Sequence, residues 1–156
     1  MVQNIVDVLK QEHREVINGL NRIVQSKGTM QRDLMDRELQ RVQQLTVQHL
    51  TGEEGGFYPR LQPYMPGPVQ EALREHQEIR THMQQAMSAS EQGEMMRHLE
   101  MLMQAVQHHV EEEEKIFPRV IETFDSQRLA EMAHTFEDAK RQAPGMGMPG
   151  WAEAAR

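Results

Sequence analysis

The 156-residue sequence contains no cysteine. This absence excludes disulfide bonds, thiolate zinc sites, iron–sulfur clusters and thiol redox chemistry, because each of them needs a cysteine sulfur. Any redox chemistry would therefore require a bound metal or cofactor. Aromatic residues are also scarce, at 4% of the chain, whereas there are 13 methionines, so we expect a core built mainly from methionine and aliphatic side chains.

Long apolar runs and clusters of basic residues are missing as well. No stretch approaches the roughly 20 apolar residues that a membrane-spanning helix needs, and residues 1–10 lack the basic and apolar regions of a signal peptide. We therefore expect a cytoplasmic protein with no membrane partner. The net charge of -7 argues against a nucleic-acid partner, and the chain length suits one compact domain.

What the sequence does contain is an internal repeat. Two segments, His49 to Pro59 and His109 to Pro118, share a pattern of histidine, three residues, glutamate, and then an aromatic residue followed by proline. Residues four apart lie on the same face of a helix. An imidazole nitrogen and a carboxylate oxygen one turn apart can therefore bind the same transition-metal ion. The residues at these positions are His49 with Glu53 and His109 with Glu113.

A single histidine in the segment before each motif extends the repeat. The sequence around His13 reads Gln-Glu-His-Arg-Glu, and the sequence around His76 reads Arg-Glu-His-Gln-Glu. Two such units predict an all-α protein, an up-down four-helix bundle with four histidines and two glutamates in one interior. Burying these groups without partners would be costly, whereas a dinuclear metal centre would satisfy them all.

Hydrophobic periodicity and helix-ending residues predict the extent of each element. The expected helices run from Ile5 to Lys27-Gly28, from about Gln31 to Tyr58, from Pro68 to the turn at 88–93, and from Met95 to about Pro118. Prolines 59 and 118 are expected to limit their helices, because the residue before a proline is disfavoured in the α region. A short C-terminal fifth helix, capped by Asp125 or Ser126, completes a domain of residues 1–142. The tail, residues 143–156, is rich in glycine, proline and alanine and is expected to be mobile.

Three glycines, Gly52, Gly55 and Gly56, lie near the end of the second helix. Each costs a helix roughly 1 kcal/mol relative to alanine. Two interpretations are open. Either the glycines let a neighbouring backbone approach closely or thin the wall beside the metals, or they mark a frayed last turn.

The fourth helix offers two possible ligand pairs, His108 with Glu112 and His109 with Glu113. The residues three, seven, ten and fourteen positions before His109 are all apolar, as expected of a stripe that faces the core. The spacing to the following proline instead favours His108, because it matches the spacing in the first copy of the motif. We prefer the pair of His109 and Glu113, since several positions support it. The remaining histidines, expected at the surface, are His82, His98 and His134.

The order of these histidines and glutamates resembles that of the hemerythrin-like family, also called the HHE cation-binding domain. The resemblance covers residues 5–118. It implies an up-down bundle around a non-haem di-iron centre (Fe–O–Fe), in which Glu53 and Glu113 bridge two iron ions and a histidine pair caps each ion. The metal ligands that it implies are His13, His49, Glu53, His76, His109 and Glu113.

Position 80 departs from the family's oxygen carriers, which resemble this chain but have a histidine where Arg80 stands. Four imidazoles, two bridging carboxylates and a shared oxygen leave one open position on each six-coordinate iron. We therefore expect peroxide or another small oxidant to bind at the pair, with Arg80 as a catalytic hydrogen-bond donor. The alternative is that Arg80 reaches solvent or pairs with a glutamate.

The expected function is to bind and react with dioxygen, peroxide or nitric oxide at the iron pair, as an oxidoreductase with an unknown electron donor. The alternative is a carrier or sensor that binds oxygen reversibly without turnover. Iron is chosen over manganese on the resemblance, because imidazole and carboxylate ligands suit several metals. The chain is expected to be a monomer or a weak homo-oligomer.

Overall fold

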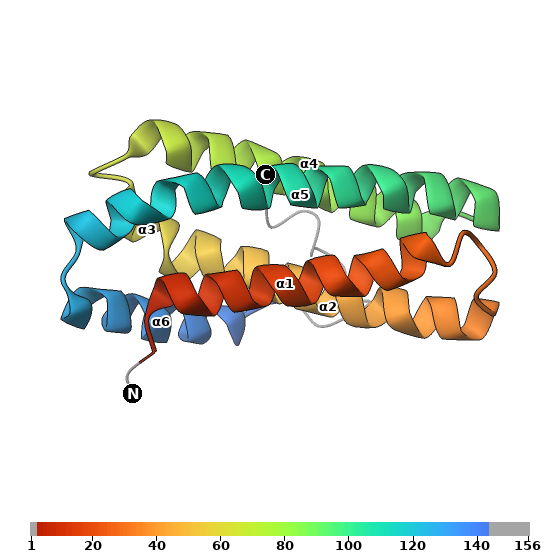
Figure 1. Cartoon of the computed structure of the whole chain (residues 1–156), viewed down its shortest axis with the longest axis horizontal. Helices are drawn as coiled ribbons and strands as arrows, with labels where there is room; N and C mark the ends of the chain where they lie inside the picture. The colour runs from red at the N-terminus through yellow and green to blue at the C-terminus, as the bar shows by residue number, and fades with distance from the viewer. Residues whose placement is uncertain (1–2, 144–156) are drawn as a thin grey trace.

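The computed structural model describes residues 3–143, and this part of the chain is all helical, as the sequence predicts. The helices are α1 (Ile5–Gln25), α2 (Arg32–Gly56), α3 (Tyr58–Leu61), α4 (Pro66–Ser88), α5 (Gln92–Thr123) and α6 (Ser126–Lys140). Figure 1 shows α1, α2, α4 and α5 side by side along the long axis as a helical bundle, with α6 packed against α2 and α1. None of the helices in the described range is long and apolar enough to cross a membrane. The predicted mobile tail lies outside the described residues, apart from Ala143.

Two apolar cores lie inside the bundle. One contains the buried aromatic residues, including Phe57, Phe117 and Phe136. The other is built from methionine and aliphatic side chains such as Met83 and Leu99, so the expected composition of the core describes this second core only. Along α1, α4 and α5, a buried histidine separates the residues of the two cores, and in α2 the buried Glu53 lies between Leu50 of one core and the following Phe57 of the other. A layer of buried polar side chains therefore crosses the bundle between the two cores.

The caps at two helix ends match the sequence prediction. α1 ends at Gln25, and both Lys27 and Gly28 then adopt positive φ angles of 49° and 79°, which stop the helix. Asp125 caps α6, because its side chain accepts a hydrogen bond of 2.9 Å from the backbone N–H of Arg128.

The two prolines do not limit the helices as predicted. α2 ends at Gly56, before Pro59, which lies in the first turn of α3, where its missing N–H costs nothing. Pro118 lies inside α5, which continues to Thr123. A proline inside a helix removes one backbone hydrogen bond. The buried Val120, two residues beyond Pro118, anchors the last turn in the aromatic core and offsets that loss.

The three glycines of α2 lie against α6. A Cβ atom built on Gly52 would lie 2.6 Å from a ring carbon of Phe136, and one on Gly56 would collide with the backbone of Thr135. The hydroxyl of Thr135 also donates a 2.7 Å hydrogen bond to the carbonyl of Gly56. The close approach of a neighbouring backbone is therefore confirmed, whereas a thinned wall and a frayed last turn are both wrong, because α6 covers the glycines and α2 is helical up to Gly56.

Candidate metal centre

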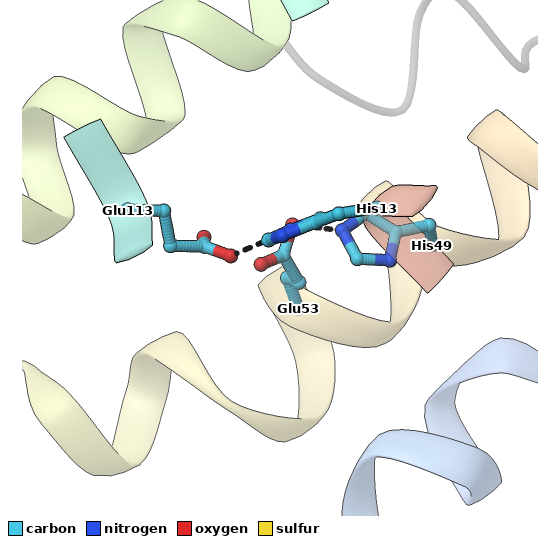
Figure 2. A group of neighbouring side chains, drawn as sticks. All are labelled: His13, His49, Glu53 and Glu113. Carbon is cyan, nitrogen blue, oxygen red and sulfur yellow. Dashed lines mark ion pairs between the residues drawn. The ribbon is translucent and has the colours of Figure 1, made fainter. Parts of the chain in front are cut away.

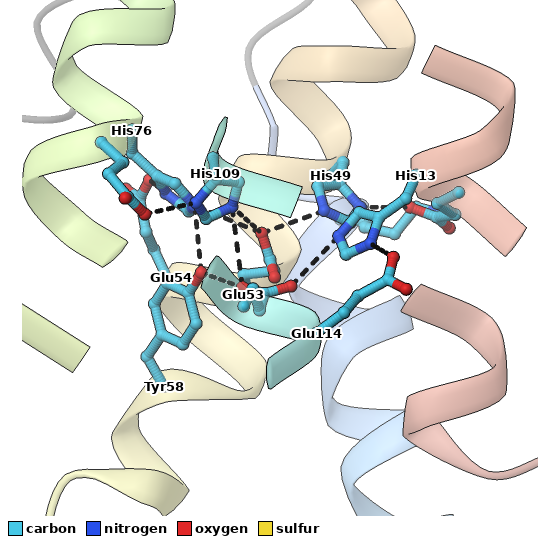
Figure 3. Close-up of polar contacts among 12 residues, drawn as sticks. His13, His49, Glu53, Glu54, Tyr58, His76, His109 and Glu114 are labelled. Atoms are coloured by element: carbon cyan, nitrogen blue, oxygen red, sulfur yellow. Dashed lines mark hydrogen bonds and ion pairs between the residues drawn. The ribbon is translucent and has the colours of Figure 1, made fainter. Parts of the chain in front are cut away.

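The polar layer brings together the six side chains that the repeat singled out. Figure 2 shows Glu113 pointing toward His13, and Figure 3 shows the other five side chains of the set pointing toward one another. Each residue is at most 4% exposed, although histidine and glutamate are normally found nearer the surface. The six are His13 of α1, His49 and Glu53 of α2, His76 of α4, and His109 and Glu113 of α5.

Helix α5 turns His109, not His108, toward the interior. The side chain of His109 is 2% exposed, whereas that of His108 is 59% exposed. Glu113 is likewise buried and Glu112 is not. The apolar stripe on α5 therefore determines which face is buried, and the proline spacing does not.

The imidazole Nε2 atoms face the two glutamates at the centre of the layer. Figure 2 shows Nε2 of His13 beside Glu113 and Nε2 of His49 beside Glu53, at distances of 3.1 and 3.0 Å. On the other side of the layer, Nε2 of His76 lies 3.2 Å from Glu53. Nε2 of His109 lies 3.6 Å from each of the two carboxylates. The carboxylates thus lie between two pairs of histidines.

Two groups of donor atoms are close enough to hold a metal ion, with all donor atoms of a group within 4.8 Å of one another. The first group is His13, His49, Glu53 and Glu113, and the second is Glu53, His76 and His109. The ring centroids are 4.9 Å apart in the first histidine pair and 4.7 Å apart in the second. His13 and His76 therefore belong to different groups.

A second set of glutamates, which the sequence analysis did not identify, holds the outer edge of each imidazole. The Nδ1 atom of each of the four central histidines lies within hydrogen-bond distance of one carboxylate from a different helix. A neutral imidazole that donates from Nδ1 keeps its Nε2 lone pair free for a metal. The pairs are His13 with Glu114 (2.8 Å), His49 with Glu12 (3.0 Å), His76 with Glu54 (2.6 Å) and His109 with Glu75 (2.9 Å).

These outer glutamates follow the internal repeat. Glu12 and Glu75 each precede the first histidine of their unit and contact the second histidine of the same unit. Glu54 and Glu114 each follow a central glutamate and contact the first histidine of the other unit. Adjacent residues on a helix point in different directions, so one short segment can supply a central ligand and also support a ligand on a neighbouring helix.

Several buried polar atoms at the centre face one another but make no hydrogen bond of suitable geometry within the described part of the chain. They include Nε2 of His13, His49 and His109, both carboxylate oxygens of Glu53 and one of Glu113. Buried polar atoms without partners are rare and costly in folded proteins. Imidazole nitrogens and carboxylate oxygens are ligands for several transition metals. The donor set therefore fits bound metal ions.

The charges at the centre also favour a cation. Burial lowers the pKa of His49, but the charges of Glu53 and Glu113 and the hydrogen bond to Glu12 together outweigh burial and raise that pKa to about 10. The pKa of His109 is likewise raised to about 10, against burial, by hydrogen bonds and by the charges of both carboxylates. Burial and the negative charge of Glu53 raise the pKa of Glu113. Two carboxylates so close together repel each other, and a cation between them would relieve that repulsion.

Tyr58 is a further polar side chain of the layer that sequence reasoning missed. Its buried hydroxyl donates a hydrogen bond to Glu113 and lies 3.1 Å from Nε2 of His76. Burial and the nearby charge of Glu113 raise the pKa of the phenol well above its usual value. The available signal was the difference between the two motifs, since phenylalanine stands before the proline in the second copy. That residue, Phe117, stacks on the ring of His13 with centroids 6.2 Å apart.

Arg80 lies on the outer side of His76. Its buried guanidinium donates a 2.7 Å hydrogen bond to Glu54, which also contacts Nδ1 of His76. This arrangement matches the alternative in which Arg80 pairs with a glutamate, and a catalytic role for Arg80 stays a prediction. Neither candidate metal group includes any of the three remaining histidines, of which His134 is exposed as predicted, whereas His82 and His98 are half-buried.

A small cavity of about 20 Å³ lies beside three of the four central histidines. This volume is enough for one water-sized molecule. Apart from Thr46, the other lining residues are aliphatic. The lining residues are His13, His49, His109, Val16, Thr46, Leu50, Ile79, Val106 and Val110.

A helical bundle with a buried layer of histidines and glutamates is the arrangement in which bundle proteins build metal sites. The chain matches the family model of the Hemerythrin HHE cation binding domain over residues 4–121, and it belongs to this family. Comparisons with curated proteins and with solved structures gave no match.

Proposed function

We propose that this protein holds two iron ions in the central layer and binds or reacts with dioxygen, peroxide or nitric oxide there. The observation that carries this proposal is the convergence of four imidazole Nε2 edges on two buried carboxylates, with partnerless donor atoms at the centre. Membership of a cation-binding family supports it. The proposed metal ligands are His13, His49, Glu53, His76, His109 and Glu113.

The two central glutamates are the proposed bridging ligands. Glu53 belongs to both groups of donor atoms. The two oxygens of Glu113 face His13 on one side and His109 on the other. A bridging carboxylate needs one oxygen for each metal, and both glutamates lie where they can provide it.

The four outer glutamates have the proposed task of orienting the imidazoles. A carboxylate on Nδ1 fixes the tautomer and the ring plane, and it increases the basicity of Nε2. The bundle that supports this arrangement is proposed to have the up-down topology of the family, with α1, α2, α4 and α5 as its four helices. Short connections from Gln25 to Arg32 and from Ser88 to Gln92 support that topology, because they join helices that pack on each other. We propose a cytoplasmic monomer or weak homo-oligomer.

The proposed small ligand would enter the cavity beside His13, His49 and His109. An iron pair supplies redox chemistry and open coordination positions for dioxygen, peroxide or nitric oxide. The residues of the chain exclude bulk water from this space, because its lining is mostly aliphatic. On the opposite side of the layer, the hydroxyl of Tyr58 holds a proton next to Glu113 and His76. An oxidoreductase could use this proton.

The second candidate function is reversible binding without turnover, as in a carrier or a sensor. The cavity favours it, because its aliphatic lining offers few groups that could donate protons to a bound ligand. Arg80, which was expected to donate to the ligand, instead hydrogen-bonds to Glu54.

The test is elemental analysis and optical spectroscopy of protein purified without added metal. We expect two irons per chain and the absorption of an oxo-bridged di-ferric pair. A reversible spectral change with dioxygen would support the carrier, whereas rapid oxidation with consumption of peroxide would support the enzyme. A folded protein that takes up neither iron nor manganese would overturn the proposal.

A further inference from the structure

Helix α6 packs tightly against the part of α2 that carries the central ligands. The ring of Phe136 lies edge-on to the ring of His49, with centroids 5.9 Å apart. The absence of a side chain at Gly52 makes this approach possible, because a Cβ there would lie 2.6 Å from Phe136 and 2.8 Å from the stem of Lys140. Gly52 lies between the two ligands of α2, His49 and Glu53, so the last two turns of α6 contact the metal-binding segment itself.

The last residue of α6, Lys140, reaches from this contact to an outer glutamate. Its ammonium group donates a 2.5 Å hydrogen bond to one oxygen of Glu12. The other oxygen of Glu12 lies 3.0 Å from Nδ1 of His49. The two side chains are largely buried, with 20% of Lys140 and 16% of Glu12 exposed. Lys140, Glu12 and His49 therefore form a chain of three groups that ends at the central layer.

The equivalent position in the other half of the repeat has a different neighbour. Glu75 contacts Nδ1 of His109 as Glu12 contacts Nδ1 of His49. Instead of a lysine, the exposed His108 lies 3.2 Å from Glu75. The two halves thus share their histidines and outer glutamates but differ in the side chain that faces the outer glutamate.

We propose that Lys140 is a positioning residue for His49, and that α6 thereby tunes only one of the two metal positions. Lys140 holds the Glu12 carboxylate in place, and Glu12 holds the imidazole with its Nε2 toward the centre. Supporting groups of this kind typically change metal affinity 10- to 100-fold when they are removed. This inference rests on the proposed function, because it assumes that the central layer binds metal.

The test is a calorimetric titration of metal-free protein with Zn²⁺, a redox-inactive probe that accepts imidazole and carboxylate ligands. We expect two binding steps in the wild type, and the His49→Gln variant identifies the step that depends on His49. The Lys140→Met variant keeps most of the aliphatic stem but loses the charge. It is expected to weaken the His49 step about tenfold and to leave the other step unchanged.

Two further variants separate positioning from general stabilisation. Arg141→Met removes the charge of the next residue, the C-cap of α6, which is exposed and pairs with Asp138, so it should change neither step. In a Glu12→Gln background, Lys140→Met should have little additional effect, because Lys140 acts through Glu12. The conservative variant Lys140→Arg should retain most of the affinity.

An unchanged His49 step in Lys140→Met would overturn the role of Lys140. So would an equal loss in both steps, or effects of Lys140→Met and Glu12→Gln that simply add, since these are what a merely structural contact would produce. A wild-type protein that binds neither Zn²⁺ nor iron would overturn the metal centre and this inference together. If the wild type binds metal but the variants do not behave as expected, only the role of Lys140 is overturned and the proposed metal centre is not.

Discussion

The two halves of the internal repeat place equivalent donor atoms at the centre but differ in what lies behind them. In the half formed by α1 and α2, Glu12 contacts His49 and is held by Lys140 of α6. In the half formed by α4 and α5, Glu75 contacts His109 and has the exposed His108 beside it. The repeat therefore determines the positions of the donors, whereas residues that differ between the two halves, together with Lys140 of α6, determine their surroundings.

The inner side of the layer differs between the halves as well. The hydroxyl of Tyr58 lies against His76, whereas the ring of Phe117 stacks on His13. The hydroxyl adds a proton and a polar atom on one side, whereas the phenylalanine offers only an apolar face. Two metal ions bound here would therefore have different chemical environments despite matching histidine pairs.

Removal of the shared carboxylate of Glu53 should abolish metal binding in both halves of the layer. Glu53 belongs to both groups of donor atoms, so Glu53→Ala is expected to lose both metal ions after purification. Iron content by elemental analysis measures the effect. Glu112→Ala, an exposed substitution on α5, serves as the control and should retain two ions. Two ions in Glu53→Ala would show that this carboxylate is not shared.

Removal of one central histidine should abolish metal binding in only one half of the layer. We expect His49→Ala and His109→Ala each to retain one ion per chain, because each side chain belongs to a different group. His108→Ala is the matched control for His109, since the neighbouring side chain is 59% exposed, and it should keep two ions. If either variant lost both ions, the two groups of donor atoms would not bind their metal ions independently.

The difference between Tyr58 and Phe117 can be removed with Tyr58→Phe. If the protein is an oxidoreductase, the rate of peroxide consumption should fall by at least about tenfold, because a positioned proton donor is lost. The iron content should stay at two per chain. Tyr64→Phe, an exposed substitution, is the control. An unchanged rate in Tyr58→Phe would show that the reaction does not use this proton.

The packing of α6 against α2, which occurs in only one half of the layer, can be weakened with Gly52→Ala. The added methyl group would meet the ring of Phe136, and overpacking of this kind costs about 1–3 kcal/mol. Denaturant unfolding of the metal-free protein measures the loss. Gly93→Ala on α5 is the matched control, because a Cβ there meets no atom within 4 Å, and it should leave stability unchanged or slightly higher. Equal stability of the two variants would show that α6 tolerates the methyl group by moving away from α2.

The helices were predictable from the sequence because their apolar residues recur with helical spacing, and that spacing also placed His109 rather than His108 inside. The proline rule failed at Pro118, because it describes a local preference, and burial of the residues around it overrides that preference. The same limit applies to Arg80. Its position one turn after His76 suggested contact with the centre, but the nearby carboxylate of Glu54 binds its guanidinium.

The sequence was enough to select the six central side chains, since residues four apart share a helix face and a single histidine recurs before each of the two motifs. The ligand role of these side chains remains a prediction. Which glutamate supports which imidazole was decided only by the packing of the helices, because partners such as His13 and Glu114 are 101 residues apart in the chain. The contacts of Tyr58 and Lys140 with the layer also depend on tertiary structure. No local pattern encodes contacts of this kind, because they form only when distant helices pack side by side.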